Sequence, residues 1–475
     1  MSGPRVSVIV PMYQSGATVG ETVRWALADL DASGLSGGLG EVVVVDDGSR
    51  DDGPRIVAGL AKEDGRVRMI RQANRGLAGA RNSGLEAARA AGGWVRFIDA
   101  DDLPTPGSTG RLIEVAEGAG VDAACGSHHL IDESGGAMGR VSSVAPGKDG
   151  LIGLDDLLCA NRMGVGTVVV RRERLGPVRF DERLRVCEDW DLWLRLAESG
   201  LRWAVAPAWG GPMKLYRVRG GSLSKNFERM LEVGTDVVRR AFSRLGRGDD
   251  PRCGRAVRGQ ALAFASMRAV SEEPGAVGRA AAMLPSAEGF TSAQLAEAGV
   301  WGVLLGLGRS PEVGGRERSR WLRQLGEWWG AIGAEVNPAD LAWRVVSPRA
   351  VARACLERAA GVGGGPVVIV GAGHNGMMVI EEARRRGVAF TVRDEALAGG
   401  GANGRRFAFE PMLAPIGRGR AVVITPERDD GLVDRLRGVA AKGVGIVRWV
   451  GVRGELAGPV RAEIESAGGS AALAA

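Results

Sequence analysis

Short apolar runs alternate with amphipathic stretches along the first half of the chain. Val6–Val10 and Val42–Val45 are almost wholly apolar, which is typical of strands covered on both faces of a sheet. Val67–Ile70 and Trp94–Ile98 follow the same pattern, and segments with helical periodicity separate the runs. This alternation predicts an α/β domain with a mostly parallel sheet.

The first helix has an identifiable start. Thr18 is followed three residues later by Glu21, the spacing of a capping box, in which both side chains satisfy backbone N–H groups of the first turn. We expect a helix to begin here, and another around Ala78–Ala90.

The pattern changes after residue 226, where strand signals disappear. Helices are expected around 226–245, 252–270, 315–332 and 348–360. Five tryptophans fall in this stretch, for which core or interface packing is favoured over a carbohydrate-stacking surface; they are Trp301, Trp321, Trp328, Trp329 and Trp343. Strand and helix signals return after the linker Gly361–Pro366. The expected division is a first domain at 1–226, a helical module at 227–360, a small α/β domain at 361–455 and a tail at 456–475.

Composition and charge narrow the function classes. With 475 residues, 45% hydrophobic and 25% charged, the chain is long enough for several cores and is not disordered. The net charge of +6 comes with an arginine and glycine excess that resembles a coding bias, since all but five of the 62 basic residues are arginine. No Lys/Arg-rich run stands out, so we expect no nucleic-acid partner.

Cysteine usage and hydropathy bear on the compartment. The five cysteines are scattered and form no C-x-x-C pair, which argues against a disulfide framework or zinc site. No signal pattern precedes Val6–Val10, and no apolar stretch approaches the ~20 residues that span a bilayer. We expect a cytoplasmic protein, with peripheral contact at the inner face of the membrane left open.

Three acidic clusters follow predicted strands or begin a helix, and open α/β sheets bind ligands at such edges. They are Asp46-Asp47-Gly48-Ser49-Arg50-Asp51, Asp99-Ala100-Asp101-Asp102 and Glu188-Asp189-Trp190-Asp191. The first also fits a plain strand-to-helix loop. The second fits a Mg²⁺ or Mn²⁺ site, because an extended chain turns Asp99 and Asp101 to one side; a solvated acidic loop is the alternative. The third fits a helix N-terminus, where acidic residues complement the dipole.

Taken in order, the motifs resemble those of a known family. They are Pro11-Met12-Tyr13, Asp46-Asp47-Gly48-Ser49, Asn74-x-Gly76, Ala80-Arg81-Asn82-x-Gly84, Asp99-x-Asp101-Asp102 and Glu188-Asp189. Over residues 4–226 this set closely resembles the family-two glycosyltransferases, which have the A-type nucleotide-sugar-binding fold.

The resemblance implies a donor-binding set. Pro11 and Tyr13 would line the pocket of the nucleotide base, and Asp47, with Asp46 and Gly48 beside it, would accept a hydrogen bond from the base. Arg81 would contact the base or the pyrophosphate, as a guanidinium suits phosphate oxygens. Asp101 would hold a Mn²⁺ or Mg²⁺ ion, and Asp99 would bind the ribose or share the metal.

The resemblance also implies a catalytic base. Asp189 would remove the proton of the acceptor hydroxyl in a single displacement that inverts the anomeric carbon. Glu188 would touch the acceptor or orient the loop, and Trp190 is a candidate for stacking on an acceptor sugar. Arg219 departs from the family pattern, in which a histidine often follows the pair matching Tyr216-Arg217 and assists the metal; the resemblance implies that Arg219 would contact the diphosphate instead. Gln14 stands where Asn is frequent.

The third domain carries a glycine motif. Gly371, Gly373 and Gly376 follow the strand run Val367–Val370, the context in which G-x-G-x-x-G holds phosphate at a helix N-terminus. The unit resembles the small Rossmann-like domains of nucleotide-sugar-modifying enzymes. A bound nucleotide or nucleotide-sugar and a purely structural or partner-docking role both stay open.

The sequence therefore predicts a metal-dependent inverting glycosyltransferase of polysaccharide biosynthesis. Its donor is a nucleoside-diphosphate sugar, and its acceptor a glycan, lipid-linked saccharide, polysaccharide or protein. The alternatives are a catalytically silent nucleotide-sugar sensor or scaffold, and a bifunctional protein whose Rossmann unit binds a nicotinamide cofactor.

Overall fold

The computed structural model describes most of the first 300 residues and shorter segments beyond them. The described residues are 5–36, 39–90, 92–142, 144, 147, 149–206, 211–219, 226–303, 316–338, 341–342, 354–360, 367–370, 379, 383, 386, 388–393, 409–410, 421–424, 445–448 and 457. The chain forms two compact units: one takes in Met1–Leu284 and Leu305–Gly308, the other Pro285–Leu304 and Arg309–Ala475. The domain boundaries expected from the sequence stay a prediction.

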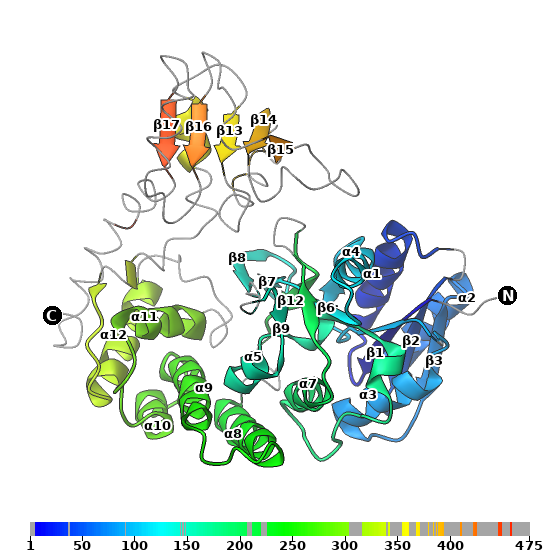
Figure 1. The fold of residues 1–475 in the computed structure, drawn as a ribbon, viewed down its shortest axis with the longest axis horizontal. Helices are drawn as coiled ribbons and strands as arrows, with labels where there is room; N and C mark the ends of the chain where they lie inside the picture. The colour runs from blue at the N-terminus through cyan, green and yellow to red at the C-terminus, as the bar shows by residue number, and fades with distance from the viewer. Residues whose placement is uncertain are drawn as a thin grey trace. The chain divides into compact units, whose positions relative to one another are not determined.

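An eight-stranded sheet forms the centre of the first unit (Figure 1), in the order β3-β2-β1-β4-β10-β6-β11-β9. The strands are β1 (Val6–Met12), β2 (Gly40–Asp46), β3 (Val67–Arg71), β4 (Trp94–Phe97), β6 (Ala123–Cys125), β9 (Leu151–Ile152), β10 (Val168–Arg171) and β11 (Trp203–Val205). The first four run parallel, whereas β10 is antiparallel to both of its neighbours. The predicted α/β fold with a mostly parallel sheet is confirmed for this unit.

Helices cover both faces of this sheet, which explains why its strands are apolar throughout. Along β1, Val8 and Val10 pack with Val23, while Ile9 points to the other face and packs with Leu85. The helices are α1 (Val19–Ala32), α2 (Gly53–Glu63), α3 (Gly76–Ala87), α4 (Ser108–Gly118), α5 (Leu154–Cys159), α6 (Arg172–Leu175) and α7 (Glu188–Glu198), with a 3₁₀ turn at Val165–Thr167.

The predicted capping box at the start of α1 is wrong. The Thr18 side chain accepts no capping bond; its hydroxyl lies 3.4 Å from the Ser15 carbonyl oxygen. Glu21 instead accepts a bond from Arg217 Nη2 at 2.9 Å. The Glu21 carboxylate, which the sequence spacing assigned to the helix backbone, is instead paired with a residue far along the chain.

A second, four-stranded sheet has the order β5-β12-β7-β8. Its strands are β5 (Leu103–Pro104), β12 (Lys214–Arg217), β7 (His128–Ile131) and β8 (Ala137–Ser142). β5 begins directly after the acidic run and pairs with β12. A segment more than a hundred residues further along the chain is thereby placed beside Asp99–Asp102.

Three helices complete the first unit: α8 (Phe227–Arg244), α9 (Pro251–Ala269) and α10 (Ala276–Met283). The first two confirm the helices expected at 226–245 and 252–270. Side chains of Asn226 and Asp250 cap their N-termini. Because α8 packs against α7, these helices support the element that carries the candidate base.

The second unit contains α11 (Ser292–Trp301) and α12 (Arg316–Ala331), the latter as expected. Trp321, Trp328 and Trp329 are buried, which confirms core packing for these three; Trp343 lies outside the described residues. No helix in the described part of the chain is long and apolar enough to cross a membrane.

The second unit also holds a five-stranded, wholly parallel sheet in the order β15-β14-β13-β16-β17. The strands are β13 (Val367–Val370), β14 (Phe390–Arg393), β15 (Phe409–Glu410), β16 (Ala421–Ile424) and β17 (Gly445–Arg448). The motif glycines Gly371, Gly373 and Gly376 lie outside the described residues, and so does the tail at 456–475 except for Ala457.

Candidate active site

The first predicted cluster lies at the carboxyl edge of the main sheet. Met12 at the end of β1 is in register with Asp46 at the end of β2, and Asp99 follows β4, the other neighbour of β1. Tyr13, the residue after β1, is 55% exposed. The sheet thus brings Tyr13, Asp46, Asp47 and Asp99 to one edge, where such folds bind ligands.

Asp46 and Asp47 are both buried and bonded to the loops around them. Asp46 accepts bonds from the Ser49 N–H at 2.9 Å and from Arg71 Nε at 2.8 Å. Asp47 accepts from Gln72 Nε2 and from the N–H groups of Arg75 and Gly76, all within 2.8 Å. The pair therefore fixes the shape of the edge, and direct contact of Asp47 with a nucleotide base stays a prediction.

Gln14 and Gly48 connect the loops after β1 and β2. Gln14 Oε1 accepts from the Arg50 N–H at 2.7 Å, and its own N–H donates to Ser49 Oγ at 3.0 Å. Gly48 has φ +84° and a Cβ there would lie 3.3 Å from the Asn74 nitrogen, so the turn requires glycine. Pro11 is buried within β1 and Tyr13 follows that strand, so these bonds tie the loop after β1 to the loop after β2.

Arg81 joins two carboxylates from different parts of the chain, Asp99 and Glu188. Its guanidinium donates to Asp99 Oδ1 at 2.6 Å and forms a short ion pair with Glu188. Burial works against the charge of Arg81, but Asp99 and Glu188 outweigh it and hold its pKa above the ordinary value. With 1% exposure, Arg81 is committed to these partners, and contact with a base or pyrophosphate stays a prediction.

Asp189 is the second residue of α7, directly after Glu188. Its Oδ1 accepts from the Trp190 N–H at 2.7 Å and from Asn161 Nδ2 at 3.3 Å. Burial, followed by the charge of Glu188, raises the pKa of Asp189 to about 6, although Arg81, Trp190 and Asn161 favour its ionised form. A carboxylate with a pKa near neutrality suits a general base.

The start of α7 is fixed by an unusual backbone conformation. Cys187 has φ +59°, a left-handed conformation that non-glycine residues rarely adopt. Its Sγ lies 3.9 Å from the Met230 carbonyl oxygen of α8. This turn directs the chain into α7 and so positions Glu188 and Asp189.

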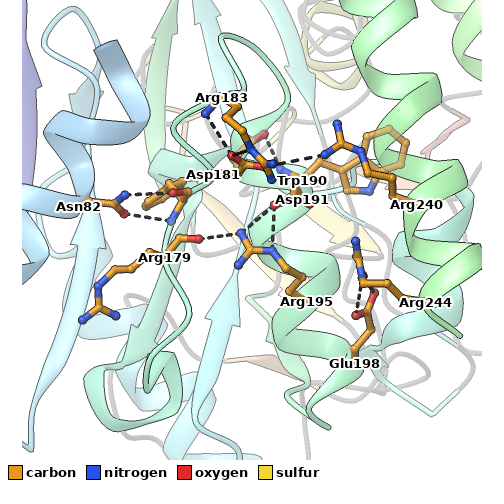
Figure 2. A network of polar contacts seen from close by, with 12 residues as sticks. Asn82, Arg179, Asp181, Arg183, Trp190, Asp191, Arg195, Glu198, Arg240 and Arg244 are labelled. Atoms are coloured by element: carbon orange, nitrogen blue, oxygen red, sulfur yellow. Dashed lines mark hydrogen bonds and ion pairs between the residues drawn. The ribbon is translucent and has the colours of Figure 1, made fainter. Parts of the chain in front are cut away.

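A polar network joins α7 to the segment that precedes it and to α3 (Figure 2). Asp191 accepts from Arg195, whose Nη2 donates to the Arg179 carbonyl oxygen at 2.6 Å. Asn82 of α3 bonds Phe180 through both its amide nitrogen and its oxygen. The network joins α3, the loop before α7 and α7 itself, and thereby supports the two carboxylates at the helix start.

Trp190 does not occupy the place expected from the sequence. It is 2% exposed, packs in the core and donates its indole N–H to the Leu157 carbonyl oxygen at 2.8 Å. This leaves no exposed ring face for an acceptor sugar, so we correct that assignment. The spacing beside Asp189 was compatible with either role, and helix geometry turned this ring inward.

The acidic run is held by β12. Asp102 forms a buried ion pair with Lys214 and accepts from the Arg217 N–H at 3.1 Å. Burial lowers the pKa of Lys214, but Asp102 and Asp99 outweigh it and raise that pKa above the ordinary value. Asp101 lies 3.2 Å from Arg219 Nη1.

Asp99 and Asp101 suit a hard divalent ion. Their side chains are 29% and 30% exposed, and carboxylate oxygens are the ligands that Mg²⁺ and Mn²⁺ prefer. Within the described residues, no group of three or more His, Cys, Asp or Glu side chains could hold a metal. Two carboxylates suit an ion whose other coordination positions are filled by substrate phosphates and water.

Several site residues were missed by sequence reasoning. Lys214 and Asn161 belong to no motif, and Asp102 was assigned only to the acidic run. The rarity of lysine in this chain, together with the position of Lys214 just before Tyr216-Arg217, was the one available signal.

One comparison with known proteins bears on the N-terminal region of the chain. Residues 7–173 match the family model "Glycosyl transferase family 2". The N-terminal region therefore contains a family 2 glycosyltransferase domain, which confirms the predicted resemblance for that region.

Two curated relatives align with part of the chain. Succinoglycan biosynthesis protein ExoO of Rhizobium meliloti is 34% identical over 47% of this chain and 63% of its own length. The GalNAc(5)-diNAcBac-PP-undecaprenol beta-1,3-glucosyltransferase of Campylobacter jejuni is 31% identical over 41% and 60%. The chain thus spans less than two thirds of each relative.

A solved structure also aligns, the mannosyltransferase PcManGT from Pyrobaculum calidifontis in complex with GDP-Man and Mn²⁺. It is 19% identical, covers 69% of this chain and 86% of its own, and has a TM-score of 0.40. A score this low carries no inference about this chain.

Proposed function

We propose that the first unit is a metal-dependent inverting glycosyltransferase of polysaccharide biosynthesis. Its donor is a nucleoside-diphosphate sugar and its acceptor a hydroxyl of a saccharide, with lipid-linked saccharides the favoured class. The observation that carries the proposal is that the two terminal nitrogens of Arg81 pair with Asp99, which follows β4, and with Glu188, the neighbour of Asp189. The names of the two curated relatives, one in succinoglycan synthesis and one acting on an undecaprenol-linked saccharide, support the acceptor class.

Asp189 supplies the proton acceptor. The acceptor oxygen forms a bond to the anomeric carbon as the bond from that carbon to the diphosphate breaks, and the hydroxyl proton passes to Asp189. One displacement inverts the anomeric configuration, and the nucleoside diphosphate leaves with the electron pair. Base catalysis of this kind contributes about 10²–10⁴-fold.

The other residues orient the reactants. Asp99 and Asp101 would hold the divalent ion, which when bound supplies Lewis-acid stabilisation of the leaving diphosphate. Arg81 keeps Asp99 and Glu188 in place, and the exposed ring of Tyr13 would stack on the nucleotide base.

A panel of nucleoside-diphosphate sugars tests the proposal. The full chain with Mn²⁺ and an undecaprenol-linked saccharide is expected to release nucleoside diphosphate from at least one donor and to lose this activity in EDTA. NMR of the product is expected to show inversion at the anomeric carbon. Retention of configuration contradicts the single displacement, and undiminished activity in EDTA contradicts the metal.

We also propose that the five-stranded sheet belongs to a Rossmann-like domain. Its order β15-β14-β13-β16-β17 is the 3-2-1-4-5 order of doubly wound sheets, and the sequence motif Gly371-x-Gly373-x-x-Gly376 directly follows β13. A nucleotide or nucleotide-sugar is the proposed ligand, with partner docking as the other outcome. Equilibrium dialysis of labelled nucleotides with the full chain and with Gly373→Val distinguishes them.

A further inference from the structure

The three carboxylates of the acidic run each have a cationic partner from the chain itself. The ion pairs are Asp99 with Arg81, Asp102 with Lys214, and Asp101 with Arg219. Each of these three carboxylates therefore has a positive charge beside it before any ion or donor binds, and Arg81 shares its charge with Glu188. A divalent cation that binds a carboxylate of this run has to compete with the basic side chain already paired with it.

The three pairs differ in how readily they open. Arg81 and Lys214 have side chains only 1% and 3% exposed, and separating a buried pair leaves an uncompensated charge, which is strongly destabilising. The side chains of Arg219 and Asp101 are 36% and 30% exposed. Such a pair contributes little to stability, so it can separate without loss of the fold.

The backbone places Arg219 at the end of a fixed segment. The preceding residue, Val218, donates its N–H to the Ile131 carbonyl oxygen at 2.9 Å. Arg217 is tied to Glu21, to the Glu133 carbonyl and to the Asp101 carbonyl. The chain is therefore anchored beside Asp101 up to Val218, while Arg219 contacts the carboxylate with its side chain at 3.2 Å.

We propose that Arg219 is a displaceable counter-cation of the metal site. It occupies the Asp101 carboxylate in the donor-free enzyme and leaves it when the divalent ion binds there. The inference rests on the proposed function, in which Asp101 is a metal ligand.

Two consequences follow from electrostatics. The guanidinium repels a cation approaching Asp101, so the ion alone binds weakly. A diphosphate attracts the guanidinium and frees the carboxylate, so ion and donor favour each other's binding, as linkage requires of any such coupling.

Titration with Mn²⁺ alone tests the proposal, with free Mn²⁺ followed by electron paramagnetic resonance. The unsubstituted 475-residue chain is compared with Arg219→Gln, Arg219→Lys and Arg55→Gln. The last of these removes an exposed arginine paired with Asp52. Arg219→Gln is expected to bind Mn²⁺ about tenfold more tightly, an order of magnitude set by Coulomb repulsion at a partly exposed site. Arg219→Lys and Arg55→Gln are expected to match the wild type.

Equal Mn²⁺ affinity of Arg219→Gln and the wild type overturns the proposal. Thermal melting of each variant establishes that it is folded, and the charge-retaining Arg219→Lys separates lost charge from lost packing.

A second substitution separates this inference from the metal assignment. Adding Asp101→Asn to Arg219→Gln is expected to abolish the tight Mn²⁺ binding. If the double variant binds Mn²⁺ as tightly as Arg219→Gln does, the ion is not at Asp101, and the metal site of the proposed function fails together with this inference. If Asp101→Asn weakens binding but Arg219→Gln does not strengthen it, only the role of Arg219 fails.

Discussion

Arg81 Nη2 donates to Asp99 Oδ1 at 2.6 Å, and this contact joins α3 to the acidic run. The second arm of the same guanidinium pairs with Glu188 at the start of α7. One buried cation thus fixes the separation between the residues assigned to the donor and those assigned to the acceptor. The proposed geometry of transfer therefore depends on Arg81 even if its side chain touches neither substrate.

Removing the Arg81 charge is therefore expected to affect both stability and activity. Arg81→Met leaves Asp99 and Glu188 without their shared partner, which is expected to lower the free energy of unfolding by about 3–5 kcal/mol. Urea denaturation measures this loss. Arg75→Met is the matched control, because Arg75 is half exposed and its pair with Glu182 is expected to contribute at most about 1 kcal/mol. Equal losses in the two variants contradict the account.

The pH dependence of transfer follows from Asp189. The base has to be ionised, and its pKa is raised to about 6, so kcat/KM for the acceptor is expected to fall as pH drops below about 6 and to level off above it. Activity is lost on the acid side because only the ionised carboxylate can accept the proton.

Asn161→Ala tests this assignment. It removes a bond that favours the charged form of Asp189, so the profile is expected to move to higher pH. Asn226→Ala, at the N-cap of α8, is expected to leave the profile in place. A profile that stays fixed or moves to lower pH in Asn161→Ala argues against Asp189 as the titrating group.

Lys214 is expected to stabilise the fold through Asp102. Lys214→Met leaves a buried carboxylate beside Asp99 and Asp101, at an expected cost of about 3–5 kcal/mol in unfolding free energy. Adding Asp102→Asn removes that charge but keeps an acceptor for the Arg217 N–H, so the double variant is expected to recover at least half of the loss. If the losses of unfolding free energy in Lys214→Met and in Asp102→Asn simply add in the double variant, the two residues are not coupled.

The effect of a substitution at Cys187 is expected to depend on how well the new residue adopts the left-handed backbone conformation found there. Its φ of +59° suits Gly and Asn but not a β-branched residue. Cys187→Asn is expected to retain stability and transfer, whereas Cys187→Val is expected to lose about 1–3 kcal/mol and to displace the start of α7. Wild-type melting temperature and rate in Cys187→Val would contradict the positioning role of this turn.

The sequence allowed prediction of the strands and of the carboxylates at their ends. Val42–Val45 is apolar on both faces, and the chemistry of Asp99 and Asp101 follows from their spacing after a buried strand. The partners of these groups could not be predicted in the same way. Arg81 and Glu188 are 107 positions apart, Lys214 and Asp102 are 112 apart, and only the tertiary fold brings them together. Glu21 shows that a local pattern can also mislead, because its carboxylate pairs with Arg217 and does not cap the helix.

The rate of transfer by Asp189→Asn is the most direct test of the central claim. With a donor found to turn over and its acceptor, the account predicts a loss of about 10²–10⁴-fold or more in kcat, while calorimetry shows donor affinity nearly unchanged. Transfer by Asp189→Asn at the wild-type rate would contradict the account, because no proton acceptor would then be needed at the start of α7.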